Sequence, residues 1–282
     1  MLTEFALAHE PLVRVTAFIL TLAAMVLWEI RAPRRDLVAP KLKRWRNNLS
    51  LLLMNVLIVR ILFPAAAVGF AAFAQTHQMG LLQMIAMPDA LVTIAAILLL
   101  DLAIYLQHLV FHAVSPLWRL HRVHHADLDF DATTGTRFHP IEVLLSMGIK
   151  FLIIVTLGPP VIAVLIFETL LNVMAMFNHS NISMPNQVDR ILRGLLVTPD
   201  MHRVHHSIDC VETNANFGFC FSFWDRLLGT YKPAPALGHT AMTIGIPEFR
   251  DPNDVINLQG MLVLPLGVVV PLHPSAPRPG KH

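Results

Sequence analysis

The residues of this sequence best suited to chemistry are histidines, which gather in three closely spaced motifs. They are His108-x-x-x-His112, His121-x-x-His124-His125 and His202-x-x-His205-His206. Side chains at positions i, i+3 and i+4 of a helix share one face, so each motif presents its imidazoles in one direction. Neutral imidazole binds iron, zinc, copper or nickel, and eight such ligands exceed what one ion of four to six coordination can use. The spacing therefore predicts a site for two metal ions.

Two further histidines are candidates to complete this site. His139 precedes and His179 follows a long apolar stretch, and both are expected at the same membrane face as the three motifs. Pro140 and Glu142 follow His139 as they would at the start of a helix. His139 is therefore either a metal ligand or merely a residue at a helix boundary.

The elements that must position these histidines are membrane helices. Of the 282 residues 55% are apolar and only 14% are charged, which is typical of a protein dissolved in a bilayer. Residues 12–30, 49–74 and 91–112 are each long and apolar enough for one span. Residues 141–178 are longer still and carry Gly158-Pro159-Pro160 near their centre, which predicts a helical hairpin. The predicted fold is all-α, a multi-pass integral membrane helical bundle with a cytosolic helical cap that carries the di-metal site.

We expect three regions along the chain. Residues 1–89 hold the first two transmembrane helices, and residues 90–232 form a catalytic domain that contains the third span and the hairpin. Residues 233–282 are rich in proline and glycine and are expected to form an irregular, peripheral tail.

The distribution of charge predicts the orientation. The loop between the first two spans carries Arg31, Arg34, Arg35, Lys41, Lys43, Arg44 and Arg46, whereas residues 75–89 contain no lysine or arginine. The positive-inside rule places the first loop in the cytoplasm, and threading through the later spans brings every histidine motif to that face. The net charge of +2 gives no electrostatic basis for binding nucleic acid.

Charged residues within the spans indicate a functional interior. Asp101 lies seven residues before His108 and Glu168 eleven residues before His179, so each is expected on the helical face of that histidine, supporting the ligands. Arg60, Asp101, Lys150 and Glu168 also lie at matched depth, which predicts that their charges neutralise one another. Independent snorkelling of each side chain is the alternative.

The motifs resemble those of the fatty acid hydroxylase and sterol desaturase superfamily, which carries one His-x-x-x-His motif and two distant His-x-x-His-His motifs. The stretches DLAIYLQH, RFHPIE, FNHSN and NFGFCFSFWDRLLGTY are also similar, and the resemblance covers about residues 90–232. It implies a di-iron centre that uses O2 to hydroxylate or desaturate an unactivated C–H bond of a membrane lipid, such as a sterol or a fatty acyl chain.

The resemblance also implies cofactors and partners. The expected cofactors are two iron ions, which zinc can replace in purified protein. The expected partners are a membrane lipid, O2 and a separate electron donor of the cytochrome b5, ferredoxin or reductase type. The protein would lie in a bacterial inner membrane or the endoplasmic reticulum, with its histidine site on the cytoplasmic face.

Two other classes of function stay open from the residues alone. A zinc-dependent membrane hydrolase also uses histidine ligands, but the sequence has no His-Glu-x-x-His motif and more histidines than one zinc needs. A metal-transporting or metal-binding membrane protein would place its ligands along a path near the bilayer centre, whereas these motifs lie at the ends of the predicted spans.

Overall fold

The computed structural model describes residues 2–267 of the chain, and over these residues it is helical and contains no strand. Helical stretches that are long and apolar enough to cross a membrane are Glu10–Arg31, Lys41–Met84, Asp89–Ala113, Pro140–Leu157 and Val161–Asn178. The prediction of an all-α membrane bundle with a helical cap is thereby confirmed. His273 and His282, to which the sequence assigned no role, lie outside the described residues.

The long helices form because apolar side chains dominate them, and their ends follow local signals. They are α2 (Glu10–Arg31), α3 (Lys41–Leu62), α5 (Asp89–Ala113), α7 (Pro140–Leu157) and α8 (Val161–Asn178). Gly158 ends α7 in the left-handed region with φ 60°, where glycine is favoured, and Pro159 and Pro160 then prevent the helix from continuing. A hairpin results.

The second predicted span is a broken helix. α3 ends at Leu62, and a separate helix α4 (Ala66–Thr76) follows after Pro64. The missing N–H and the fixed φ of this proline interrupt the hydrogen bonds of the helix. α3 also begins at Lys41 rather than near residue 49, so that it includes the basic residues before the apolar stretch. The expected span at 49–74 is therefore divided between two elements.

Short helices build the two ends of the bundle. At one end lie α1 (Leu2–Ala8), α4 and η1 (Leu81–Met84). At the other end residues 114–139 and 179–267 form what we call the cap. Its elements are α6 (Ser115–His125), η2 (Thr134–Thr136), α9 (Asn186–Leu192), α10 (Pro199–His205), α11 (Cys210–Thr213), α12 (Phe223–Leu227), α13 (Gly238–Ala241), α14 (Pro252–Ile256), α15 (Leu258–Val263) and η3 (Leu264–Leu266).

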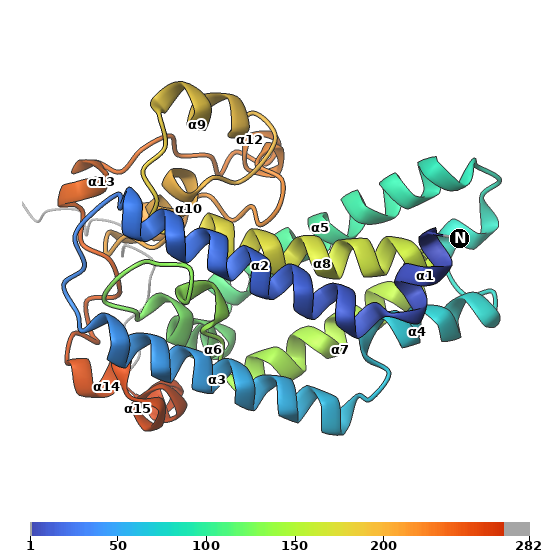
Figure 1. Ribbon diagram of the computed structural model, residues 1–282, viewed down its shortest axis with the longest axis horizontal. Helices are drawn as coiled ribbons and strands as arrows, with labels where there is room; N and C mark the ends of the chain where they lie inside the picture. Colours follow the sequence, from blue (N-terminus) through green and yellow to red (C-terminus); the bar gives the residue numbers. More distant parts are fainter. Residues whose placement is uncertain (1, 268–282) are drawn as a thin grey trace, which may run out of the picture.

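The long helices run roughly along one axis, with the cap gathered at one end and α1 and α4 at the other (Figure 1). α2 lies along α8, α5 packs on α8, and α3 packs on α7. The ends of α2, α5 and α8 and the starts of α3 and α7 all meet the cap. This arrangement brings the histidine motifs and the basic segment 31–46 to the same end of the molecule.

The C-terminal region differs from the irregular tail that we expected. Its helices α14 and α15 bury Val255, Ile256 and Met261 in one core with Leu51 of α3 and Trp118 of α6. Apolar side chains spaced for one helical face are enough to fold these short segments onto the bundle, although proline and glycine surround them. The described part of this region is therefore integral to the cap.

Candidate metal centre

Nine buried histidine rings converge where the cap meets the bundle, and they form two groups. The first group is His108, His112, His121, His125 and His205, and the second is His124, His179, His202 and His206. Within each group the candidate ligand nitrogens all lie within 4.8 Å of one another. The geometry thus offers two adjoining sites of five and four nitrogens.

The sequence motifs do not correspond to the two groups. The one-turn spacing of α6 sends His121 and His125 to the first group and His124 to the second. At the end of α10, His205 belongs to the first group while its neighbour His206 belongs to the second. Each of these two motifs therefore serves both sites.

Hydrogen bonds on the outer nitrogen fix the tautomers of three rings. The Nδ1 atoms of His108, His205 and His179 contact the carbonyl oxygens of Phe217, Ala215 and Ala175 at 2.9, 2.8 and 2.7 Å. A carbonyl only accepts, so each Nδ1 carries the hydrogen and each neutral Nε2 presents a bare lone pair. Burial lowers the pKa of His179 and of His205 to about 3, which keeps both rings neutral.

In the first group, two bare nitrogens face each other at a distance that a hydrogen bond does not explain. The Nε2 atoms of His108 and His205 lie 2.9 Å apart, although neither has a hydrogen to donate. Two lone pairs repel at this distance unless a cation lies between them, so this pair fits a bound metal ion. In the second group, the bare Nε2 of His179 lies 3.0 Å from His124 Nε2 and 3.1 Å from His202 Nε2, close enough for the three rings to share one ion.

Unpaired polar atoms in the same place support this interpretation. His121 Nε2 and both ring nitrogens of His206 are buried and have no hydrogen-bond partner within residues 2–267. Buried polar atoms are nearly always paired, and coordination to a metal accounts for such exceptions. His121 Nδ1 meanwhile contacts the Glu142 carboxylate at 2.6 Å, the arrangement by which a carboxylate orients a metal-binding imidazole.

His139 lies outside both groups. It is the N-cap of α7, where its Nδ1 accepts a hydrogen bond from Ile141 N, and its Nε2 contacts the Leu262 carbonyl at 3.3 Å. Both ring nitrogens are therefore engaged elsewhere, so the ligand role expected for His139 finds no support and the boundary role fits. Pro140 and Glu142 had indicated the boundary alternative, but only the contacts of both ring nitrogens distinguish the two.

Asp101 acts on the segment that supports His108 rather than on a histidine. Its carboxylate accepts hydrogen bonds from the backbone N–H groups of Cys220 and Phe221 at 3.1 and 3.2 Å and from Trp224 Nε1 at 3.0 Å. The same segment provides the Phe217 carbonyl for His108. Asp101 therefore positions the metal site indirectly.

Glu168 takes part in ion pairs inside the bundle. Lys150 Nζ lies 2.5 Å from its carboxylate and an Arg14 guanidinium nitrogen 3.3 Å. The expectation that Arg60 and Asp101 join this set is wrong, because Arg60 donates to the Pro64 carbonyl and Asp101 faces the 220–224 segment. Matched depth on separate helices brings charges together only where those helices pack.

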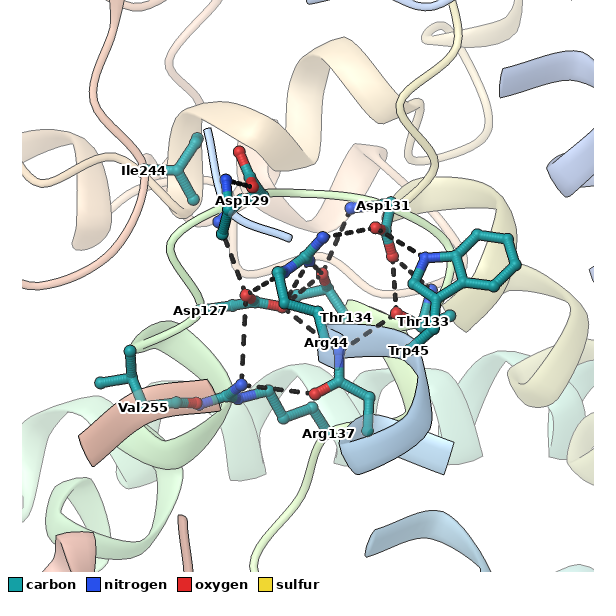
Figure 2. A network of polar contacts seen from close by, with 12 residues as sticks. Arg44, Trp45, Asp127, Asp129, Asp131, Thr133, Thr134, Arg137, Ile244 and Val255 are labelled. Carbon is teal, nitrogen blue, oxygen red and sulfur yellow. Dashed lines mark hydrogen bonds and ion pairs between the residues drawn. The ribbon is translucent and has the colours of Figure 1, made fainter. Parts of the chain in front are cut away.

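A buried ionic network holds the loop between α6 and α7. Arg44 of α3, fully buried, binds both carboxylate oxygens of Asp127 at 2.7 Å and one of Asp131 at 2.6 Å (Figure 2). Arg137 donates to the carbonyls of Val123 and Val255 beside it. Burial alone would raise the pKa of Asp127, but Arg44 and Arg137 hold it below its usual range. This network fixes the loop that directly follows the ligands on α6, and the sequence analysis did not identify it.

A cavity of about 510 Å³ extends from the metal groups into the bundle. His108, His121, His124 and His202 line the end of the cavity that lies at the metal groups. Residues of α2, α3, α5, α7 and α8 line the rest, and the lining is mostly apolar. Its size is in the range of sites that hold small organic ligands, so an apolar chain can reach both metal groups from within the bundle.

Comparison with known proteins identifies the part of the chain that contains both metal groups. Residues 93–230 match the fatty acid hydroxylase family. An ornithine lipid hydroxylase, OlsE of Rhizobium tropici, is 28% identical over 158 residues, which cover 56% of this chain and 46% of the relative. No solved structure matches.

Two vertebrate proteins are also similar. The alkylglycerol monooxygenase of Xenopus tropicalis is 30% identical over 133 residues, covering 47% of this chain and 29% of the relative. The human cholesterol 25-hydroxylase is 30% identical over 144 residues, covering 49% and 50%. The matched segments therefore span at most half of these relatives. Residues 93–230, which match the family, contain all the histidines of both metal groups. Residues 93–230 of this chain belong to the fatty acid hydroxylase superfamily.

Proposed function

We propose that this protein is an O2-dependent lipid hydroxylase in which the nine converging histidines hold two iron ions. The observation that carries the proposal is the convergence of nine buried imidazoles in two groups, with the bare Nε2 atoms of His108 and His205 only 2.9 Å apart, at one end of an apolar cavity. When bound there, two irons would supply the O2-dependent oxidation of an unactivated C–H bond, which side chains cannot perform by acid–base chemistry.

The number of ligands favours two metal ions over a single zinc. Neutral imidazole is a ligand for iron as well as for zinc, and a zinc site holds about four ligands. Nine imidazoles also exceed what a hydrolase with one zinc requires.

Hydroxylation is the reaction that the relatives favour over desaturation. The names of the three relatives describe hydroxylases or monooxygenases that act on an ornithine lipid, an alkylglycerol or cholesterol. The cavity of this chain would hold an apolar chain against His124 and His202 and exclude water from it. Electrons would come from a separate donor protein at the cap, which the positive-inside rule places in the cytoplasm.

Iron content tests the metal centre. Purified wild-type protein should contain about two irons per chain, and His112→Ala and His124→Ala, one in each group, should each lose at least one. His139→Ala is the matched control, because His139 lies at the same face but outside both groups, and it should keep both irons. One zinc per chain without iron would instead support a hydrolase.

Products test the reaction. Lipids from cells that produce the wild-type protein should contain a species heavier by one oxygen, and this species should be missing from cells that produce His124→Ala. His139→Ala should still form it. If the lipids of wild-type and His124→Ala cells are the same while both proteins are present, the proposed function is wrong.

A further inference from the structure

A cluster of charged side chains lines the cavity away from the metal groups. Glu168 of α8 is buried and lies 2.5 Å from Lys150 Nζ of α7 and 3.3 Å from a guanidinium nitrogen of Arg14 on α2. Arg14 also binds Glu10 at 2.8 Å. Arg60 of α3 lines the same cavity. Three cations and two carboxylates thus surround this part of the cavity.

The ion pairs leave one cation without a carboxylate. Glu168 and Glu10 are matched by Lys150 and Arg14, whereas Arg60 has no carboxylate partner among the described residues and donates only to the Pro64 carbonyl at 3.3 Å. Arg60 is exposed and lies two residues before the end of α3, so its charge is not held in a buried ion pair. Because it lines the cavity and no carboxylate of the described residues neutralises it, this part of the cavity carries an excess positive charge.

The cluster and the metal groups lie at opposite ends of one apolar passage. Glu142, which contacts His121, and Lys150 are both on α7 and eight residues apart, which corresponds to about 12 Å along the helix. Val143 and Met147 line the cavity between them. A molecule with a charged group at Lys150 can therefore extend an apolar chain along the passage to the metal end.

We propose that Arg14, Arg60 and Lys150 bind the single negative charge of an anionic lipid and thereby fix which part of its apolar chain reaches the metals. The identification of this lipid as the substrate rests on the proposed function, but the binding site itself does not. The shared chemistry is one oxyanion on a long apolar chain, provided either by a fatty acid carboxylate or by the phosphate of a membrane phospholipid. Arg14, Arg60 and Lys150 are binding residues in this proposal.

Binding of a matched acid and ester tests the charge. Iron-loaded full-length protein in phosphatidylcholine nanodiscs is titrated with palmitate and with methyl palmitate, which differ only in the charged group. The wild type should bind palmitate about tenfold more tightly, the equivalent of one charge-assisted hydrogen bond. Equal affinity for acid and ester would overturn the proposal.

Two variants test the residues. Arg60→Met breaks no ion pair and should fold normally, yet it should reduce the preference for palmitate severalfold. Lys150→Met should do the same, whereas Lys150→Arg should keep the preference because the charge is kept. If both methionine variants melt at a lower temperature but keep the full preference for the acid, the cluster is structural and the proposal fails.

Competition identifies the source of the oxyanion. Displacement of labelled palmitate by phosphatidylglycerol but not by phosphatidylcholine would support a phospholipid, and no displacement by phosphatidylglycerol would support the free acid. Equal displacement by both phospholipids would show that charge is not recognised and would overturn the proposal. These measurements need no turnover, so a protein that prefers palmitate but oxidises no lipid would contradict only the proposed function.

Discussion

The outer nitrogen of each histidine decides what its inner nitrogen can do. Spacing on a helix predicts which rings share a face, and it identified the eight motif histidines that now lie in the two groups. His179 was inferred from its place after the hairpin, and the structure brings it to the second group. The partners of His108 and His205 were not predictable in this way, because the Phe217 and Ala215 carbonyls belong to irregular backbone, and Phe217 lies 109 residues from His108.

Glu142 is the residue whose role was missed although it was noticed. Helix-start preferences already explain an acidic residue at this position, so nothing in the sequence pointed to a contact with a histidine. Only the packing of α6 against α7 shows that its carboxylate lies 2.6 Å from His121 Nδ1.

Loss of this carboxylate should weaken iron binding without unfolding the protein. Glu142→Ala should reduce the affinity for iron about 10- to 100-fold, the usual effect of removing a partner that orients a ligand. Glu142→Gln, which keeps an acceptor but not the charge, should fall between it and the wild type. Competition with a chelator measures the affinity, and unchanged values for both variants would remove Glu142 from the site.

At the level of elements, one basic residue of the first loop proves to be a core residue. The positive-inside rule explains the basic segment as a whole, but it does not show that Arg44 lies on α3 and faces Asp127 and Asp131. The start of α3 must pack on the loop that carries both aspartates before these charges can pair, and sequence spacing contains no such information.

Removal of Arg44 should be strongly destabilising. Arg44→Met removes the cation bound to the buried Asp131 and leaves Asp127 with Arg137 alone, and it should cost about 3–5 kcal/mol of unfolding free energy. Arg46→Met is the control, since Arg46 is exposed two positions away and should change stability by less than about 0.5 kcal/mol. Unfolding in mild detergent compares the two variants, and equal stability would contradict the network.

The turn of the hairpin makes a second prediction at this scale. A Cβ on Gly158 would lie 2.1 Å from the Met79 carbonyl oxygen, and one on Gly80 would lie 2.1 Å from Gly158 N. Both residues also have positive φ, so Gly158→Ala and Gly80→Ala should each lower the melting temperature. Gly148→Ala within α7 meets no atom within 4 Å and should leave stability unchanged or raise it. Equal melting of all three variants would show that this turn is loosely packed.

For the whole molecule, hydropathy and charge predicted a bundle with every histidine motif at one end. The hairpin brings together motifs that are distant in sequence, and its Gly-Pro-Pro turn could be predicted from the sequence. The contribution of α14 and α15 to the cap could not be predicted, because the Pro- and Gly-rich composition around them resembles that of an irregular tail.

Orientation in the membrane is a prediction at this scale. In a Cys210→Ser background, where the remaining Cys220 is buried, His77→Cys should react with an impermeant maleimide in intact cells. Asp254→Cys, exposed on the cap, should react only after lysis. The opposite pattern would place the metal groups outside the cytoplasm and would contradict the proposed site of electron delivery.

The division of the motifs on α6 and α10 between both groups has a consequence for metal uptake. If two ions bind as proposed, the first to arrive would fix helices that also carry ligands for the second, so the ordering cost of the second site would already be met. Loading should accordingly be cooperative. Cells with scarce iron would then contain chains with two irons and chains with none, but few chains with one. The amount of fully loaded protein would rise steeply with iron supply rather than in proportion to it.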